Sequence, residues 1–131
     1  QKDSLWRYYN EKELLVSEET YRFGNLNGPS RTFYKNGKVA ERFIYVEGLK
    51  EGEWKQFYEE GQEMVKCLYV NNQLHGHYIR YYQEGSVEFE GRYKNDLKDG
   101  VWRFYLPTGK VDYELEYENG RLLTELQLED E

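Results

Sequence analysis

The sequence predicts an all-β protein, folded as a single-layer antiparallel meander of about ten strands that is open and twisted. Two observations support this prediction. The 131-residue chain repeats with a period of 24 residues, which is typical of stacked arrays. Each repeat contains two runs rich in aromatic and β-branched residues, separated by Gly, Asn or Asp, as expected of β-hairpins. No long run shows the spacing of an amphipathic helix.

Five β-hairpin units of 24 residues follow one another without insertion or deletion, at 4–27, 28–51, 52–75, 76–99 and 100–123. Glycine opens four of the five units, at Gly28, Gly52, Gly76 and Gly100. One column holds a tyrosine in every unit: Tyr21, Tyr45, Tyr69, Tyr93 and Tyr117. We expect neighbouring units to bury Tyr45, Tyr69 and Tyr93 largely. An acidic tail, 124–131, follows the array.

The third unit illustrates the predicted elements. A first strand begins at Gly52 and ends before Glu60-Gly61, and a second strand covers 63–70. We predict a short two-residue hairpin at Glu60-Gly61 and at the equivalent Asn36-Gly37, because Asn-Gly is the strongest signal for such a turn. The other turn of each unit, which leads to the next opening glycine, is predicted to be wider.

Two segments carry a recognisable motif: Gly52-Glu-Trp-Lys-Gln-Phe-Tyr-Glu-Glu-Gly61 and Gly100-Val-Trp-Arg-Phe-Tyr-Leu-Pro-Thr-Gly109. The motif resembles the MORN repeat, in the longer variant common in bacterial proteins, many of which are described as antitoxin-like. The resemblance implies β-hairpin repeats in an elongated sheet. It also implies a scaffold, a partner-binding module or a membrane-associated region. The sequence departs from the motif at Ser4, Glu13 and Ser30.

Charge and composition narrow the function classes. The net charge of −7 disfavours nucleic acid and anionic membranes as partners. The nearest approach to a basic run is Arg31, Lys35, Lys38 and Arg42, which we interpret as solvated strand faces. The only cysteine, Cys67, is interpreted as a buried thiol. The chain begins at Gln1 rather than Met, which favours an exported protein, periplasmic or in the cell envelope, over a cytoplasmic one.

The residues suggest little catalytic chemistry. His75 and His77 flank Gly76 and would point the same way on a strand, as the start of a metal site would require. No third ligand is identifiable, and a single-layer sheet offers few shielded pockets. We therefore predict no enzyme, catalytic residue, metal or cofactor. A small metal-dependent or hydrolytic enzyme domain is one alternative, and a lipid-surface binding module is another.

We predict a non-enzymatic repeat scaffold that binds a protein partner or self-assembles. One candidate surface is an aromatic sheet face, which serves as core, as binding groove or as both. The other is an open edge strand. Acidic residues protect the edge expected at 112–118, so the edge at 5–10 is predicted to pair with a partner or form a homodimer. The aromatic candidates are Trp6, Trp54, Tyr58, Tyr78, Tyr82 and Trp102.

Overall fold

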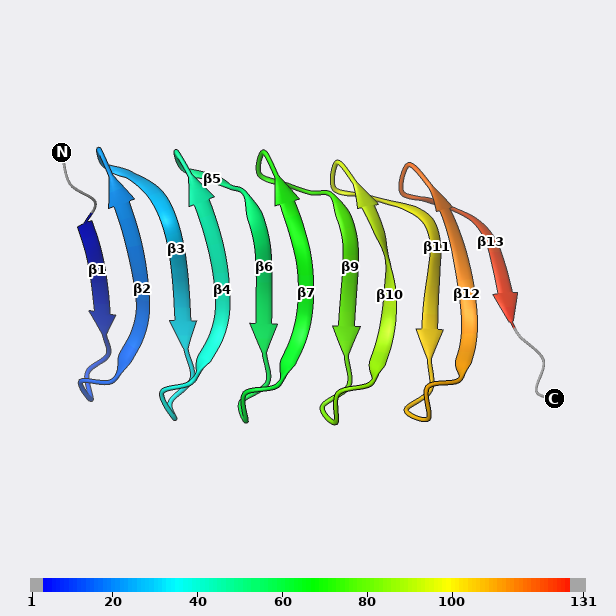
Figure 1. Cartoon of the computed structure of the whole chain (residues 1–131), viewed down its shortest axis with the longest axis horizontal. Coiled ribbons are helices and arrows are strands. Elements are labelled where there is room, and N and C mark those ends of the chain that lie inside the picture. Colours follow the sequence, from blue (N-terminus) through cyan, green and yellow to red (C-terminus); the bar gives the residue numbers. More distant parts are fainter. Residues whose placement is uncertain (1–3, 128–131) are drawn as a thin grey trace.

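The computed structural model describes residues 4–127, and every regular element in this range is a β-strand (Figure 1). The strands are β1 Ser4–Tyr9, β2 Leu15–Arg22, β3 Asn25–Phe33, β4 Val39–Val46, β5 Leu49–Lys50, β6 Gly52–Phe57, β7 Glu63–Val70, β8 Gln73–Leu74, β9 Gly76–Tyr81, β10 Val87–Lys94, β11 Leu97–Tyr105, β12 Val111–Glu118 and β13 Arg121–Gln127. The all-β prediction is confirmed. No helix in the described range is long and apolar enough to cross a membrane.

All strands belong to one antiparallel sheet whose order follows the sequence, β1-β2-β3-β4-β6-β7-β9-β10-β11-β12-β13. The two-residue strands β5 and β8 lie off this path and pair with β4 and β7. Figure 1 shows a single row of bowed strands with β1 and β13 at opposite ends. Within residues 4–127, β1 pairs only with β2 and β13 only with β12, so the sheet is open, as predicted.

The predicted assignment of the two turns is wrong, because the two-residue turns lie at the other end of each unit. Asn71 and Asn72 join β7 to β8 with φ values of 49° and 68°, and positive φ at both residues defines a type I′ turn. The Asn36-Gly37 turn is wider: the Tyr34 amide donates to Lys38 O at 2.8 Å, and the Gly37 amide donates to Tyr34 O at 2.9 Å. Gly37, with φ of 87°, supplies the left-handed residue that this longer loop needs.

Repeated hydrogen bonds join each unit to the next at both ends of the hairpin. At the wide turns, the hydroxyls of Tyr34, Tyr58 and Tyr82 donate to the carbonyls of Phe57, Tyr81 and Tyr105 at 2.5, 2.6 and 2.5 Å. At the narrow turns, backbone amides donate to the preceding unit, for example Asn72 N to Lys50 O at 2.8 Å. The spacing of the units is therefore fixed by both side-chain and backbone hydrogen bonds.

The C-terminal edge differs from the predicted one. Residues 112–118 lie in β12, which is covered by β13, so they are not an edge. A type I′ turn at Asn119 and Gly120, with φ of 49° and 82°, makes this extra strand possible. β13 runs through residue 127 and brings the first part of the 124–131 segment into the sheet. The remainder, 128–131, lies outside the described residues.

Candidate binding surfaces

The two faces of the sheet carry different chemistry, because successive side chains of a strand point to opposite sides. Trp54 is directly opposite Cys67 on the neighbouring strand, while the adjacent residues Lys55 and Lys66 form the next pair. We call the side of Trp54 and Cys67 the aromatic face and the side of Lys55 and Lys66 the charged face. Each face holds one of the two rows described below.

Ring-to-ring contacts build the core on the aromatic face. Trp54 stacks on Phe43 with ring centroids 5.5 Å apart and planes 1° from parallel. Tyr78 continues the row and contacts Trp102, with centroids 5.8 Å apart. Three side chains of this face are buried: Val65 and Trp102 at 1% exposed and Cys67 at 2%. Much of the row therefore serves packing, within a sheet that has no second layer.

Residue sizes in this row are matched across strands. Small residues face large ones: Cys67 is paired with Trp54, and Gly91 with Tyr78. A Cβ atom added at Gly91 would lie 2.0 Å from the Trp102 ring. Position 91 thus leaves the space that Trp102 occupies. Cys67 and Gly91 stand at equivalent positions of the repeat, and they differ because each fits the rings around it.

The predicted aromatic binding residues have different environments in the structure. Trp54 and Tyr78 are half-buried in the ring row, and Trp102 is fully covered. Tyr58 and Tyr82 use their hydroxyls to join successive units. Trp6 is 56% exposed, so among the six it is the residue most available to a partner.

The tyrosine column is half-buried rather than largely buried, because only long side chains cover the aromatic face. Tyr45, Tyr69 and Tyr93 are all partly exposed. The Lys50 ammonium lies over the ring of Tyr69, 5.2 Å from its centroid, in a cation–π contact. Desolvation nevertheless raises the pKa of Tyr69 to about 12.

The N-terminal edge strand β1 exposes every one of its side chains. Four are large and apolar or aromatic: Leu5, Trp6, Tyr8 and Tyr9 are 52%, 56%, 42% and 59% exposed. By alternation, Trp6 and Tyr8 lie on the aromatic face and extend its row to the edge. This strand combines an unpaired backbone edge with exposed rings, the combination that favours strand pairing with another chain.

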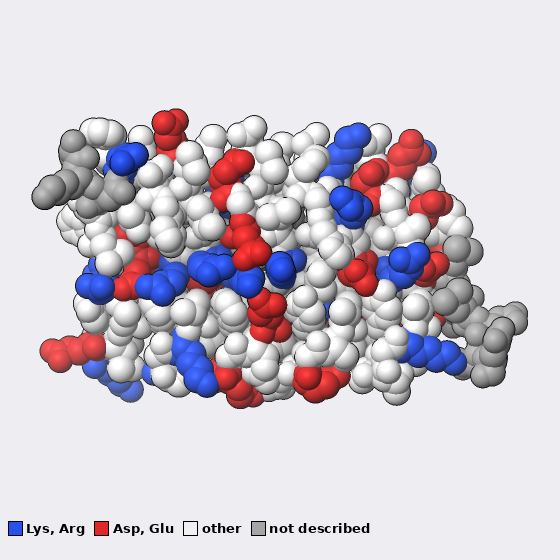
Figure 2. Space-filling view, viewed as in Figure 1, with Lys and Arg blue, Asp and Glu red and all other residues white. Residues whose placement is uncertain are grey.

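The charged face carries a row of cations across its N-terminal half. Figure 2 shows a line of blue side chains crossing the β1 side of the face in view. The strand register places one residue of the row on each successive strand, and each is directly opposite the next. In order, they are Arg7, Glu18, Arg31, Arg42, Lys55 and Lys66. We call the five cations the basic row.

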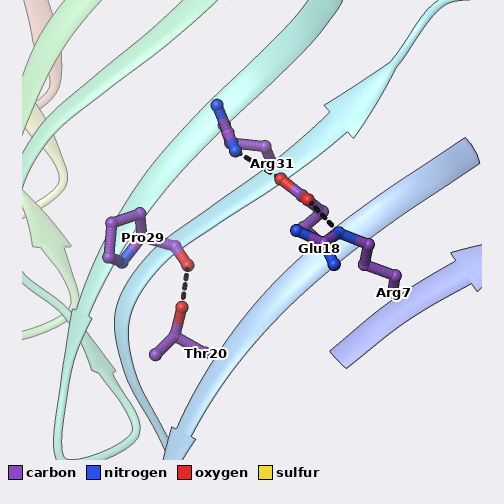
Figure 3. Close-up of polar contacts among 5 residues, drawn as sticks. All are labelled: Arg7, Glu18, Thr20, Pro29 and Arg31. Atoms are coloured by element: carbon purple, nitrogen blue, oxygen red, sulfur yellow. Dashed lines mark hydrogen bonds and ion pairs between the residues drawn. The ribbon is translucent and has the colours of Figure 1, made fainter. Parts of the chain in front are cut away.

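Glu18 lies between two arginines of the basic row (Figure 3). Its carboxylate accepts a hydrogen bond from Arg7 Nε at 2.7 Å and another from Arg31 Nη2. Together these contacts leave Glu18 only 5% exposed. The hydrogen bond from Arg7, followed by the contacts of Arg31, lowers the pKa of Glu18 against the opposing effect of desolvation. Beside this group, Thr20 Oγ1 donates to Pro29 O at 3.0 Å.

Glu53 serves the remaining cations of the row. Its carboxylate lies 3.0 Å from Arg42, 3.6 Å from Lys55 and 3.9 Å from Lys66. Lys55 also pairs with Glu63. The Nε atom of Arg42 is buried and has no hydrogen-bond partner within the described residues. Carboxylates in this part of the face are thus shared among several cations.

The C-terminal half of the same face is balanced instead. The row continues through Ile79, Glu90, Arg103 and Glu114. Arg103 pairs with Glu114, and Glu90 accepts hydrogen bonds from Tyr105 at 2.6 Å and contacts His77 Nε2 at 2.9 Å. The bond from Tyr105 and the contact with His77 lower the pKa of Glu90.

Sequence reasoning missed the basic row, because it searched for cations that are close in the sequence. The residues of the row lie 11 or 13 positions apart, one on each strand. The signal was present in the 24-residue period, which relates Arg7, Arg31, Lys55 and Arg103, with Ile79 as the exception. Of the four cations considered from the sequence, only Arg31 and Arg42 belong to the row.

The two histidines take separate roles. His77 contacts Glu90, while His75 Nδ1 accepts a hydrogen bond from the Asn95 amide at 3.4 Å. In residues 4–127, no group of three or more His, Cys, Asp or Glu side chains is placed to hold a metal ion. Desolvation raises the pKa of the Cys67 thiol to about 12, so at neutral pH it is protonated and a poor nucleophile.

Comparison with known proteins identifies the repeat. No curated protein is similar enough to the chain to serve as a relative. A family described as "MORN repeat variant" matches residues 26–47, 50–71, 74–95 and 98–126. These matches begin 24 residues apart, which is the period of the hairpins in the sheet. Together they cover well over half of the chain, which therefore belongs to the MORN repeat variant family.

Proposed function

We propose that this repeat scaffold is non-enzymatic and works by pairing its free strand β1 with a strand of a protein partner. The family supports a scaffold or binding module, and the edge supports the mode of binding. An incoming strand would satisfy the outer backbone groups of β1 and extend the sheet. The exposed Trp6 and Tyr8 would gain neighbours that continue the aromatic row.

A second copy of this chain is the first partner to test, because it brings the same strand with the same exposed rings. Tyr8→Lys with Tyr9→Pro places a charge on this edge and removes a backbone donor. Light scattering should show a dimer for the unaltered protein and a monomer for this variant. Circular dichroism should show that both remain folded.

The opposite edge supplies the control. Leu123→Lys with Thr124→Pro makes the same kind of change in β13, where Leu123 is 45% exposed. This variant should remain dimeric. A dimer that survives the β1 changes, or that is lost only with the β13 changes, would show that the edge assignment is wrong. A protein that remains monomeric at about 100 μM, above the Kd of a stable dimer, would rule out self-pairing.

A further inference from the structure

We propose that the charged face binds an acidic segment of a partner protein through the basic row Arg7, Arg31, Arg42, Lys55 and Lys66. This site is separate from the β1 edge and uses different chemistry. The proposal rests on the register of the row, the exposure of its cations, and the hollow beside it.

The register places like charges directly opposite each other. Arg31 faces Arg42, Arg42 faces Lys55, and Lys55 faces Lys66, on the four neighbouring strands β3, β4, β6 and β7. Facing cations destabilise a sheet. The C-terminal half shows that the fold does not need them, since there Arg103 faces Glu90 and Glu114. In a chain with a net charge of −7, this local excess of positive charge is a binding feature rather than a structural one.

Four of the five cations of the row are accessible, while Lys55 is only 20% exposed. The side chains of Arg7, Arg31, Arg42 and Lys66 are 52%, 44%, 37% and 45% exposed. Arg42 Nε is buried and makes no hydrogen bond within the described part of the chain. A partner carboxylate would therefore contact the exposed part of the Arg42 side chain rather than its covered Nε.

A hollow of about 390 Å³ lies beside the row and is lined by Leu5, Glu18, Thr20, Pro29, Arg31 and Arg42. Its charged side is formed by the two arginines, and Glu18 is already paired with Arg31. Leu5 and Pro29 give it an apolar side. The hollow therefore fits an aliphatic side chain flanked by carboxylates, which defines the partner as an acidic segment containing Leu, Ile or Val.

A protein segment fits better than a phosphate polymer or a lipid surface. Glu53 and Glu63 lie among the cations and would repel a continuous line of phosphates, as would the net charge of −7. Spaced carboxylates can avoid these positions. From Arg7 to Lys66 the row crosses six strands, about 24 Å at the usual strand spacing. An extended segment of about eight residues covers this distance.

The test uses a fluorescein-labelled peptide of about eight alternating Glu and Leu residues, the length that spans the row, and fluorescence anisotropy with the whole protein. Binding should be seen at low salt and weaken towards about 0.15 M salt. The peptide with Gln in place of Glu should bind at least about tenfold more weakly, as expected for lost charge pairs.

Arg42→Gln with Lys66→Gln should weaken peptide binding about tenfold or more and leave the thermal midpoint unchanged or higher, because facing cations are removed. The matched control, Arg92→Gln with Arg103→Gln, removes two cations from the same face and should change the affinity less than about twofold. Equal losses in both variants, or no binding by the unaltered protein, would overturn the proposal. Tighter binding to a single-stranded oligonucleotide or to vesicles containing phosphatidylserine, lost in the first variant, would also overturn it.

Discussion

In the aromatic row, the size of each residue matches the space left by the residues on the neighbouring strands. Trp102 contacts the rings of Tyr78, Phe89 and Tyr93, and its Nε1 donates to Arg92 O at 3.2 Å. All of these contacts depend on the open space above Gly91. A single-layer sheet has no second layer that could shift to accommodate a misplaced ring. Displacing Trp102 would therefore disrupt the packing of the aromatic row directly.

Gly91→Ala should therefore destabilise the protein by about 3 kcal/mol, because the added methyl group must displace the Trp102 ring. Chemical denaturation followed by tryptophan fluorescence measures the change. Gly109→Ala is the control: no atom lies within 4 Å of its added Cβ, and only its φ of 94° is unfavourable, which should cost about 1 kcal/mol. Equal effects at both sites would mean that the Trp102 ring is not fixed over Gly91.

Glu18 makes the N-terminal hairpins sensitive to acid. Hydrogen bonds from Arg7 and Arg31 lower its pKa in the folded state, so the ionised group stabilises the fold above the ordinary glutamate pKa of about 4.3. This contribution is lost as the pH falls through the folded-state pKa. Glu18→Gln should thus lower the free energy of unfolding at pH 7 by more than it does at about pH 3. Glu11→Gln, in the exposed turn after β1, is the matched control variant.

At the scale of elements, the hairpin unit is the module of stability. The Tyr58 hydroxyl and the Asn72 amide each bond to a residue of an adjacent unit. Equivalent bonds recur along the array, at Tyr34 and Tyr82 on one side and at Asp96 and Gly120 on the other. Removing one whole unit should therefore bring together surfaces that already match.

Deleting residues 52–75 should leave a folded protein with a lower thermal midpoint, because the stability of a repeat array is a sum over units and their interfaces. Deleting 64–75 removes β8, all of β7 except Glu63, and the turn between them. β6 would then have to pair with β9, which runs in the same direction, so this shorter deletion should abolish the cooperative melt. If the two deletions melt alike, the 24-residue unit is not the module.

The sequence was sufficient for the strands of the five units but not for the turns or for β13. The 24-residue period and the aromatic runs predict the hairpin of each unit, because the same pattern recurs in all five copies. The two turn types were exchanged because Gly at positive φ suits both a type I′ turn and the longer loop at Gly37. β13 was overlooked because 124–131 was interpreted as an acidic tail, although Asn119 and Gly120 form the same type of turn as Asn71 and Asn72.

The sequence alone predicted the β1 edge as a candidate surface but not the basic row. The exposed β1 edge follows from its low charge and its position at the start of the array. The basic row depends on register, since a shift of one residue between strands would move its cations to the other face. Neither Trp102 burial nor the hydroxyl bonds of Tyr58 and Tyr82 can be read from composition, because they depend on which neighbour each ring meets.

For the whole molecule, the direction of the end strands has a consequence for assembly. The main path contains eleven antiparallel strands, so β1 and β13 point the same way (Figure 1). A copy added end to end would place β1 beside β13 in parallel, a pairing that occurs nowhere else in residues 4–127. A two-fold axis at β1 instead sets two copies of that strand antiparallel. Such a contact uses the same surface from each subunit and closes on itself. With an even number of strands a head-to-tail contact would be antiparallel like the rest of the sheet, whereas this odd number gives antiparallel contacts only between like edges.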